Sequence, residues 1–266
     1  MSDDDDFLMG GDTHDGPRLR YLNIDHRTGL FVNKGQEVYT PQVSIEGTPL
    51  LIIPRRTFWK PREMRTDGDN PGPLCKSPNA VYGYPSPDFP WATPLPGGGR
   101  MDRSLAVPRK IEPTPQMPDG FDSGEHVTLE CASCPFAQWG PAKQPPLCKD
   151  AYLLGIMTVE DEQLEHGGVT AIEFSGGAAR NLKDYASWFK RKQLPMFAKN
   201  VSIELNRMST RGNTFASPHF TPRAETVASF SDFYADWARW FRASALNSFR
   251  PPAPKRTEST GFDGIL

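Results

Sequence analysis

The chain contains four cysteines, and their spacing suits a single metal ion. Cys131 and Cys134 form a C-x-x-C pair, Cys148 follows with thirteen residues in between, and Cys75 lies far upstream. The thiolates of a C-x-x-C turn can hold one ion, and four thiolates complete a tetrahedral zinc site that leaves no open coordination position. Such a site is structural rather than catalytic. Two disulfides, or four unrelated buried thiols, are the alternative interpretations.

The start of the chain bears on these alternatives because it indicates the compartment. Met1 and Ser2 are followed by four aspartates, whereas a secretory signal begins with basic residues. The sequence also has no apolar run near the roughly 18 residues that a membrane span needs. We therefore expect a cytoplasmic protein without a membrane partner. In a reducing cytosol the cysteine pattern favours Zn²⁺ over disulfides.

A second group of residues suits the binding of nucleic acid. The run Arg55-Arg56-Thr57-Phe58-Trp59-Lys60-Pro61-Arg62 directly follows the apolar stretch Leu50–Ile53. Bases stack on aromatic rings, and arginine and lysine pair with phosphates. Alternatively, one of the two rings faces the core, because neighbouring side chains of a strand point in opposite directions, and the cations form a solvated edge. The candidate contacts in this run are Arg55, Arg56, Phe58, Trp59, Lys60 and Arg62.

A predicted hairpin supplies two further candidate contacts. Arg207 and Arg211 lie at its tip, between the predicted strands Val201–Leu205 and Thr214–Phe220. Two cations at such a tip could clamp a strand of nucleic acid. An ordinary polar turn explains the same residues as well.

The charge of the chain is distributed unevenly. Residues 1–16 hold six aspartates and no lysine or arginine, although the net charge of the whole chain is only −2. The remaining 250 residues therefore carry 30 basic and 26 acidic side chains, a net charge of +4. This distribution suits a polyanion-binding body with an acidic arm that competes with the ligand. A solubilising tail on an ordinary surface is the alternative.

Common catalytic motifs are missing from the sequence. The five histidines form neither H-x-E nor H-E-x-x-H, and Glu130 rather than proline precedes Cys131. The signature of a zinc nucleobase deaminase is therefore absent. A P-loop motif and a G-x-S-x-G motif are absent as well. We predict that the protein is not an enzyme.

Apolar alternation and periodicity predict the elements that position these groups. The predicted strands are Tyr21–Val32 with a turn at Gly29, Val43–Ile53, Tyr152–Met157, Val169–Phe174, Val201–Leu205 and Thr214–Phe220. Helices are predicted at 178–193 and at 229–249, and the second has a broad aromatic face. We predict a mainly β fold with α additions, namely a five-stranded OB-like barrel with a C-terminal aromatic amphipathic helix.

The predicted domain organisation has three parts. Residues 1–17 form a disordered acidic arm, residues 18–250 form one OB-like nucleic-acid-binding domain, and residues 251–266 form a flexible tail. The domain carries a zinc insertion at 75–148. Residues 84–124 of this insertion hold nine prolines, which predicts a long irregular loop whose ends are pinned together by the zinc ion.

The order of the motifs resembles a known family. A basic-aromatic strand precedes Cys75-Lys76-Ser77, and the run Cys131-Ala132-Ser133-Cys134-Pro135-Phe136-Ala137-Gln138-Trp139 precedes Cys148-Lys149-Asp150 and the hairpin 201–220. Over roughly residues 45–220 the chain resembles single-stranded DNA-binding proteins of bacteriophages and mobile elements. The resemblance implies an OB-like fold with a four-cysteine zinc site and single-stranded DNA as the ligand, with RNA as the alternative. It also implies a role in phage or mobile-element DNA replication or recombination inside a bacterial host cell.

A second functional class fits the same sequence. A zinc-stabilised protein-interaction factor, docking on host replication or transcription machinery, would also use a cysteine knuckle and the aromatic helix 229–249. Replication or recombination proteins could in addition bind the two ends of the chain, where acidic and apolar residues adjoin at Asp3–Leu8 and at Phe262–Leu266.

Overall fold

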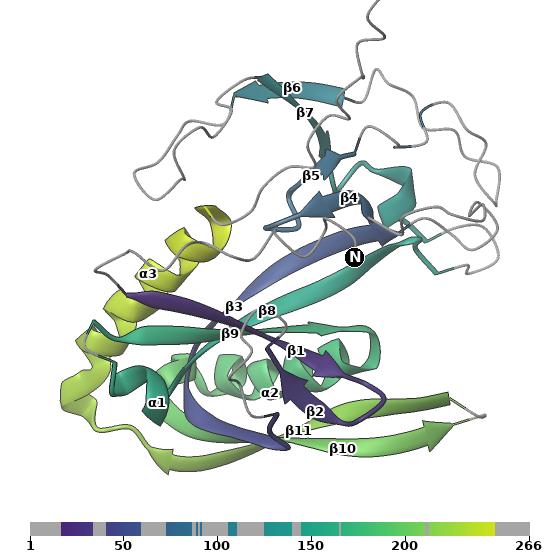
Figure 1. Ribbon diagram of the computed structural model, residues 1–266. Helices are drawn as coiled ribbons and strands as arrows, with labels where there is room; N and C mark the ends of the chain where they lie inside the picture. Colours follow the sequence, from purple (N-terminus) through teal and green to yellow (C-terminus); the bar gives the residue numbers. More distant parts are fainter. Residues whose placement is uncertain are drawn as a thin grey trace, which may run out of the picture. The chain divides into compact units, whose positions relative to one another are not determined.

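The computed structural model describes residues 17–33, 41–59, 73–86, 89, 91, 106–110, 125–139, 145–164, 166–210 and 213–247 (Figure 1). The chain forms two compact units. The first unit comprises residues 1–56, 78–80 and 149–248, and the second comprises 57–77, 81–148 and 249–266. The predicted tail 251–266 and all of the predicted acidic arm except Pro17 lie outside the described residues.

The first unit holds most of the regular structure. Its elements are β1 (Arg18–Asp25), β2 (Leu30–Val32), the larger part of β3 (Ser44–Trp59), β8 (Cys148–Thr158, from Lys149 on), α1 (Val159–Glu162), β9 (Gly168–Ser175), α2 (Gly176–Lys192), β10 (Lys199–Thr210), β11 (Asn213–Glu225) and α3 (Ser231–Asn247). Each strand and helix predicted in this part of the sequence is confirmed. The short helix α1 was not predicted, because four residues are too few to show a helical period.

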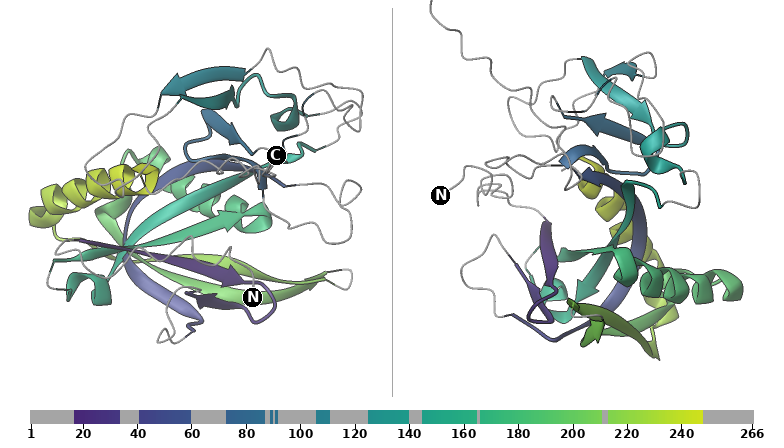
Figure 2. Two further views of the ribbon diagram at one scale, coloured as in Figure 1. Left: turned by 45° about the horizontal axis from the view of Figure 1, so that its top comes forward. Right: turned by 90° about the vertical axis from the view of Figure 1, so that its right-hand side faces the viewer.

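These strands form a mixed, open sheet. The order is β2-β1-β9-β8-β3, and β10 continues from β3 and pairs with β11. β1 and β9 are parallel, with Leu22 opposite Ile172, whereas β8 and β9 are antiparallel. β10 runs antiparallel to the start of β3, with Ile203 opposite Ile45. Figure 2 shows the hairpin β10–β11 extending along the sheet in both views.

The predicted OB-like barrel is not formed by the described strands. β2 and β11 end the sheet without pairing with each other, and within the described ranges the pairing between β2 and the segment before β3 is a single isolated bridge, Phe31 to Gln42. The sequence predicted five or six strands, fewer than the structure has, and a list of strands does not fix their partners. The parallel pairing of β1 with β9 and the continuation of the sheet into β10 leave it open.

The central strands are buried on both faces. Leu154 and Ile156 of β8 pack in one core with α2, whereas their neighbours Leu153 and Met157 pack in a second core with α3. Successive side chains of a strand point to opposite faces, so one apolar run can serve both cores. This arrangement explains why the run Tyr152–Met157 of β8 is continuously apolar rather than alternating.

α2 and α3 cover these faces through different side chains. Leu182, Tyr185 and Phe189 of α2 are buried, as their spacing predicts. α3 packs in the second core through Ala238, Phe241 and Ala245. None of the helices in the described part is long and apolar enough to cross a membrane.

The second unit is a small sheet over an aromatic core. Its strands β4 (Pro73–Ser77), β5 (Tyr82–Pro85), β6 (Ala106–Lys110) and β7 (Glu125–Glu130) lie in the order β4-β5-β7-β6. The prediction of a wholly irregular segment over 84–124 is wrong, because β6 lies within it. Pro108 argued against a strand at this position. A proline is tolerated here because, among the described residues, β6 pairs only with β7 and its other edge has no partner strand.

The contact between α3 and β8 yields a first prediction. A Cβ atom at Gly155 would lie 2.4 Å from the Phe241 ring, so Gly155→Ala should push α3 away from the sheet and lower the free energy of unfolding by about 1–3 kcal/mol. Urea unfolding measures this change in the free energy of unfolding. Gly177→Ala in the first turn of α2 is the control, since nothing lies within 4 Å of its Cβ position and alanine favours helix. Equal destabilisation by the two substitutions would contradict the close packing of α3.

Candidate nucleic-acid interface and cysteine cluster

The basic-aromatic run lies along β3, and the structure assigns its members different roles. Arg55 is largely buried, with its guanidinium donating to the carbonyl of Ala245 at 3.2 Å and to the carboxylate of Glu173 at 3.5 Å. Ala245 lies in the last turn of α3, where a cation is favoured by the helix dipole. Arg55 therefore connects α3 to the sheet, and the structure does not place it as an exposed phosphate contact.

Arg56 belongs to a small network of charges. Its Nε atom donates to Asp150 at 3.0 Å, and Lys183 of α2 lies 3.7 Å from the same carboxylate. The Lys183 ammonium also lies 4.7 Å from the ring centre of Tyr152. The pKa of Lys183 is raised, first by its hydrogen bond with Tyr152 and then by the charge of Asp150. Arg56 and Lys183 thus contact the same carboxylate.

Phe58 is a core residue of the second unit. Its side chain is 1 % exposed and stacks on Phe136 with 4.3 Å between ring centres, and Phe89 packs edge-on against both. A ring enclosed in this way cannot receive a base, so the structure corrects the expectation that Phe58 contacts nucleic acid. The alternative given by strand alternation, with one of the two rings facing the core, is the observed one.

Trp59 is the exposed member of the pair. It is 47 % exposed and follows Phe58 at the end of β3, so its ring is held by a strand whose preceding side chain is anchored in the core. An aromatic surface that is half open to solvent can stack on a base without first unfolding. Lys60 and Arg62, the next two predicted contacts, lie outside the described residues.

The predicted hairpin carries an exposed cation beside another turn. Arg207 of β10 is exposed, and its Cβ atom lies 3.8 Å from the Cβ position of Gly29 in the turn between β1 and β2. The backbone N–H of Ala216 in β11 donates to Nδ1 of His26 in the same turn. The hairpin is thus supported by the β1–β2 turn, which the sequence alone did not indicate. Arg211 lies outside the described residues.

The four cysteines gather in the second unit. Cys75 lies on β4, Cys131 and Cys134 flank the turn after β7, and Cys148 begins β8. Cys75, Cys134 and Cys148 contribute to the aromatic core, and all four carry thiols rather than disulfides. A Cβ atom at Gly83 of β5 would lie 2.7 Å from the sulfur of Cys75 and 3.8 Å from that of Cys131. Glycine at this position therefore leaves room for two sulfurs.

The sulfurs act on one another electrostatically but are not arranged as metal ligands. Burial raises the pKa of the Cys75 thiol, and the other three cysteines raise it further. In the described part of the chain, however, no three His, Cys, Asp or Glu side chains are placed to hold a metal ion as they stand. The chemistry of four clustered thiols suits zinc, but binding would require the sulfurs to draw closer together.

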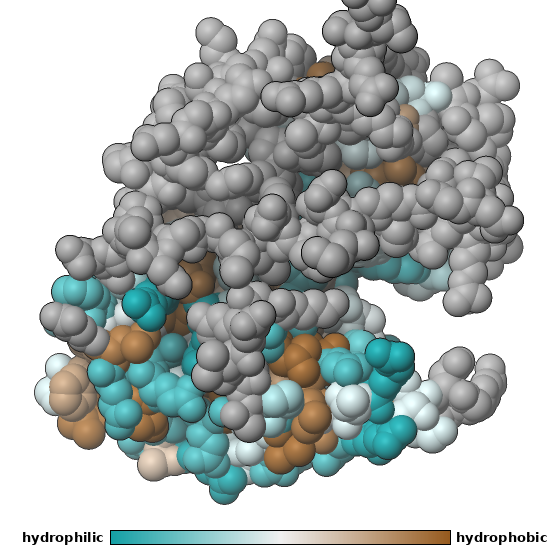
Figure 3. All heavy atoms as spheres, viewed as in Figure 1, coloured by the Kyte–Doolittle hydropathy of each residue, from teal (hydrophilic) through white to brown (hydrophobic). Residues whose placement is uncertain are grey.

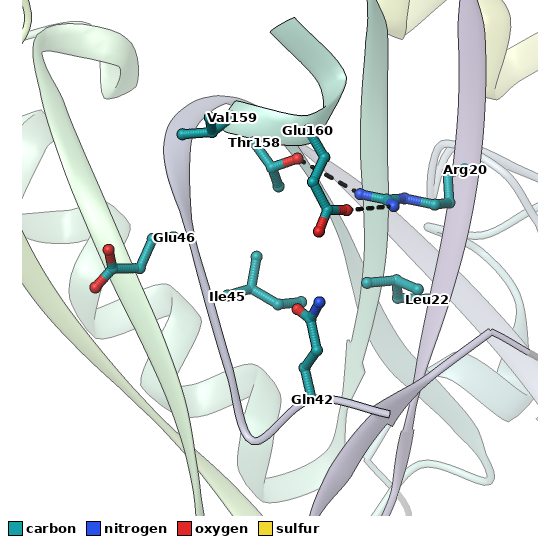
Figure 4. A pocket seen from close by; sticks show the side chains of 8 residues that line it. All are labelled: Arg20, Leu22, Gln42, Ile45, Glu46, Thr158, Val159 and Glu160. Carbon is teal, nitrogen blue, oxygen red and sulfur yellow. Dashed lines mark hydrogen bonds and ion pairs between the residues drawn. The ribbon is translucent and has the colours of Figure 1, made fainter. Parts of the chain in front are cut away.

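Two further features of the first unit could serve as sites. The aromatic face of α3 is divided, because Phe241 is buried whereas Phe230 and Phe233 remain exposed. On the face drawn in Figure 3, hydrophobic side chains of the described residues form small groups between hydrophilic ones. A cavity also opens between β1 and the start of β3 (Figure 4). Its polar groups come from segments far apart in the chain, so no local sequence motif predicts the cavity.

Comparisons with protein-family models, with curated proteins and with solved structures found no match. The functional argument therefore rests on the residues and their geometry. The resemblance to single-stranded DNA-binding proteins stays a prediction.

The different roles of Phe58 and Trp59 can be tested by stability. Phe58→Ala should lower the free energy of unfolding by about 3–5 kcal/mol, because it leaves a cavity at the centre of an aromatic core. Trp59→Ala should lower the free energy of unfolding by only roughly 0.5 kcal/mol, the usual size for a substitution at the surface. Hydrogen exchange in peptides that cover β7 and residues 131–139 would measure the loss of stability around this core. Similar protection in both variants would show that Phe58 does not support the core.

Proposed function

We propose that the protein binds single-stranded nucleic acid, with DNA as the expected ligand and RNA as the alternative, and acts in DNA replication or recombination of a phage or mobile element. The observation that carries this proposal is Trp59, a half-exposed indole on a strand end that is anchored by the buried Phe58. A ring held in this way loses little freedom when a base stacks on it. No catalytic step is proposed.

Cations on the first unit support the proposal. Arg207 is exposed on the hairpin, and Arg56 and Lys183 both lie at the carboxylate of Asp150. Such groups can pair with phosphates without a change in fold. The acidic residues 1–16 would compete with the ligand for these cations.

We further propose a structural zinc ion held by Cys75, Cys131, Cys134 and Cys148. Four thiols that influence one another, two of them beside Gly83, supply the number of donors that zinc needs, and a divalent cation would relieve the repulsion between the thiolates. The ion would join β4, the turn after β7 and the first residue of β8. Its contribution is to hold these segments together beneath the aromatic core that positions Trp59.

A second function is favoured by one specific observation. Phe230 and Phe233 are exposed at the start of α3, and they continue into a row of ring contacts through Trp237 to Trp240. Exposed aromatic residues are typical of protein-binding surfaces. The protein would then be an interaction factor that docks on host replication or transcription machinery.

The stacking role of Trp59 predicts a specific loss of affinity. Trp59→Ala should weaken binding to a thymidine oligonucleotide by about 5- to 150-fold, which corresponds to the ~1–3 kcal/mol of one stacked base. Trp59→Phe should restore most of the affinity, because a ring is retained. Fluorescence anisotropy with a labelled oligonucleotide measures both.

Val81→Ala serves as the control for exposure, since Val81 is 48 % exposed in the same unit but has no ring. This variant should bind like the wild type. Unchanged affinity in Trp59→Ala, or equal losses in Trp59→Ala and Val81→Ala, would remove Trp59 from the interface.

The zinc proposal predicts one zinc ion per chain in protein purified without chelator. Cys134→Ser should lower the zinc content and speed hydrogen exchange in the second unit, because it removes one of four ligands. Ser133→Ala, at an exposed position of the same turn, should keep the metal. Elemental analysis decides the question, and wild-type protein without zinc would refute the proposal.

A further inference from the structure

A small cavity lies where the sheet of the first unit remains open. It has a volume of about 170 Å³ and lies between β1 and the start of β3, next to the end of β8 and the first turn of α1 (Figure 4). The bridge from Phe31 to Gln42 joins the two sides of the opening. Openings of this kind in β structures are common ligand sites.

The floor of the cavity is apolar and its ends are polar. Leu22 and Ile45 form the floor, and both are almost completely buried. The side chains of Gln42 and Glu160 extend toward the cavity from opposite ends (Figure 4). Such a site offers apolar contact to the faces of a flat ring and hydrogen bonds to its edges.

Glu160 is exposed and is held by an ion pair with Arg20, behind which lie buried hydrogen bonds. Arg20 donates to its Oε2 atom at 2.9 Å and to the hydroxyl of Thr170 at 2.8 Å. Asp161 is buried and accepts from the hydroxyls of Thr158 and Thr170 at 2.9 and 2.8 Å, and it also closes the capping box that begins α1. The polar end of the cavity is therefore organised before any ligand arrives.

The charges of the cavity disfavour a phosphate. Among the described residues that line it, Arg20 is the only cation, and its charge is met by Glu160 at 2.9 Å and by Asp161 at 3.5 Å. Glu46 also lines the cavity, but its carboxylate points away from it and pairs with Arg223 at 3.5 Å (Figure 4). A neutral ligand with N–H donors fits this surrounding better than an anion does, because a carboxylate can only accept hydrogen bonds.

The volume limits the ligand to a single ring. An apolar cavity of about 150 Å³ holds one benzene molecule, whereas sites for larger ligands measure roughly 300–1,000 Å³. A cavity of about 170 Å³ therefore has room for one six-membered heterocycle but not for a sugar and phosphate in addition.

We propose that this cavity binds one pyrimidine base of a single strand, turned out of the stack; the inference rests on the proposed nucleic-acid function. Glu160 would accept a hydrogen bond from the N3–H of thymine or the exocyclic amine of cytosine. Gln42 would donate its amide N–H to a ring carbonyl oxygen. The protein would then prefer pyrimidine-rich single strands, whereas stacking on Trp59 accepts any base.

Equilibrium binding of the full chain to oligonucleotides of thymidine, deoxycytidine and deoxyadenosine tests this preference. The pyrimidine strands should bind about 5- to 150-fold more tightly than the adenine strand, as expected for one specific base contact. Gln42→Leu keeps the approximate size of the side chain but removes its amide. This variant should bind the pyrimidine strands and the adenine strand with nearly equal affinity. Binding of all three strands with equal affinity by the wild type would refute the pocket and leave the proposed function intact.

A blocking variant provides a second test. Val159 and Val227 are both 62 % exposed, but only Val159 lines the cavity. Val159→Trp should cover the cavity and abolish the pyrimidine preference, while Val227→Trp should retain it. The same ratio of pyrimidine-strand to adenine-strand affinity in the two variants would contradict the proposal.

Free nucleosides test the cavity without relying on strand binding. Thymidine or cytidine at millimolar concentration should shift the methyl resonances of Leu22, Ile45 and Val159, and Val159→Trp should prevent this. Failure to bind any oligonucleotide while these shifts persist would refute the proposed function but not the cavity. Shifts with arginine amide and none with nucleosides would show that the cavity takes a cationic protein side chain, which would overturn the inference.

Discussion

The first unit depends on the burial of β8 and β9 on both faces. Leu153 and Leu154 are neighbours in sequence, yet they pack in different cores, one with α3 and the other with α2. Each fully buried side chain of this kind stabilises the fold by about 1.5–3 kcal/mol. Because β3 lies beside β8, this double layer also fixes the part of β3 that belongs to the first unit and carries Arg55 and Arg56.

The same constraint explains why only part of the basic-aromatic run remains available for a ligand. Arg55 is drawn against the last turn of α3, and Phe58 fills the aromatic core of the second unit. Arg56 shares Asp150 with Lys183, and Trp59 keeps about half of its surface open. The residues best placed for binding are thus those that the two cores do not use.

Local patterns in the sequence predicted the elements well and their pairing poorly. The strands of the first unit and the two long helices follow from apolar periodicity, whereas β4, β5, β6 and β7 of the second unit were not predicted. Strand alternation anticipated that one of Phe58 and Trp59 would be buried. The parallel pairing of β1 with β9 joins segments about 150 residues apart, which no local pattern reveals. The cavity has the same origin, because Arg20 and Glu160 are 140 positions apart. Pro108 hid β6, since the edge position that tolerates it is a tertiary property.

The most direct test of the account is the salt dependence of binding by the full chain to single-stranded and double-stranded oligonucleotides of equal length. Cations that pair with phosphates should make the logarithm of the association constant fall linearly with the logarithm of the salt concentration, with a slope of about −0.7 for each single-strand phosphate contact. Exposed rings such as Trp59 cannot reach bases inside a duplex, so the single strand should bind more tightly at every salt concentration. Absence of single-strand binding at low salt, or equal affinity for the duplex, would contradict the account.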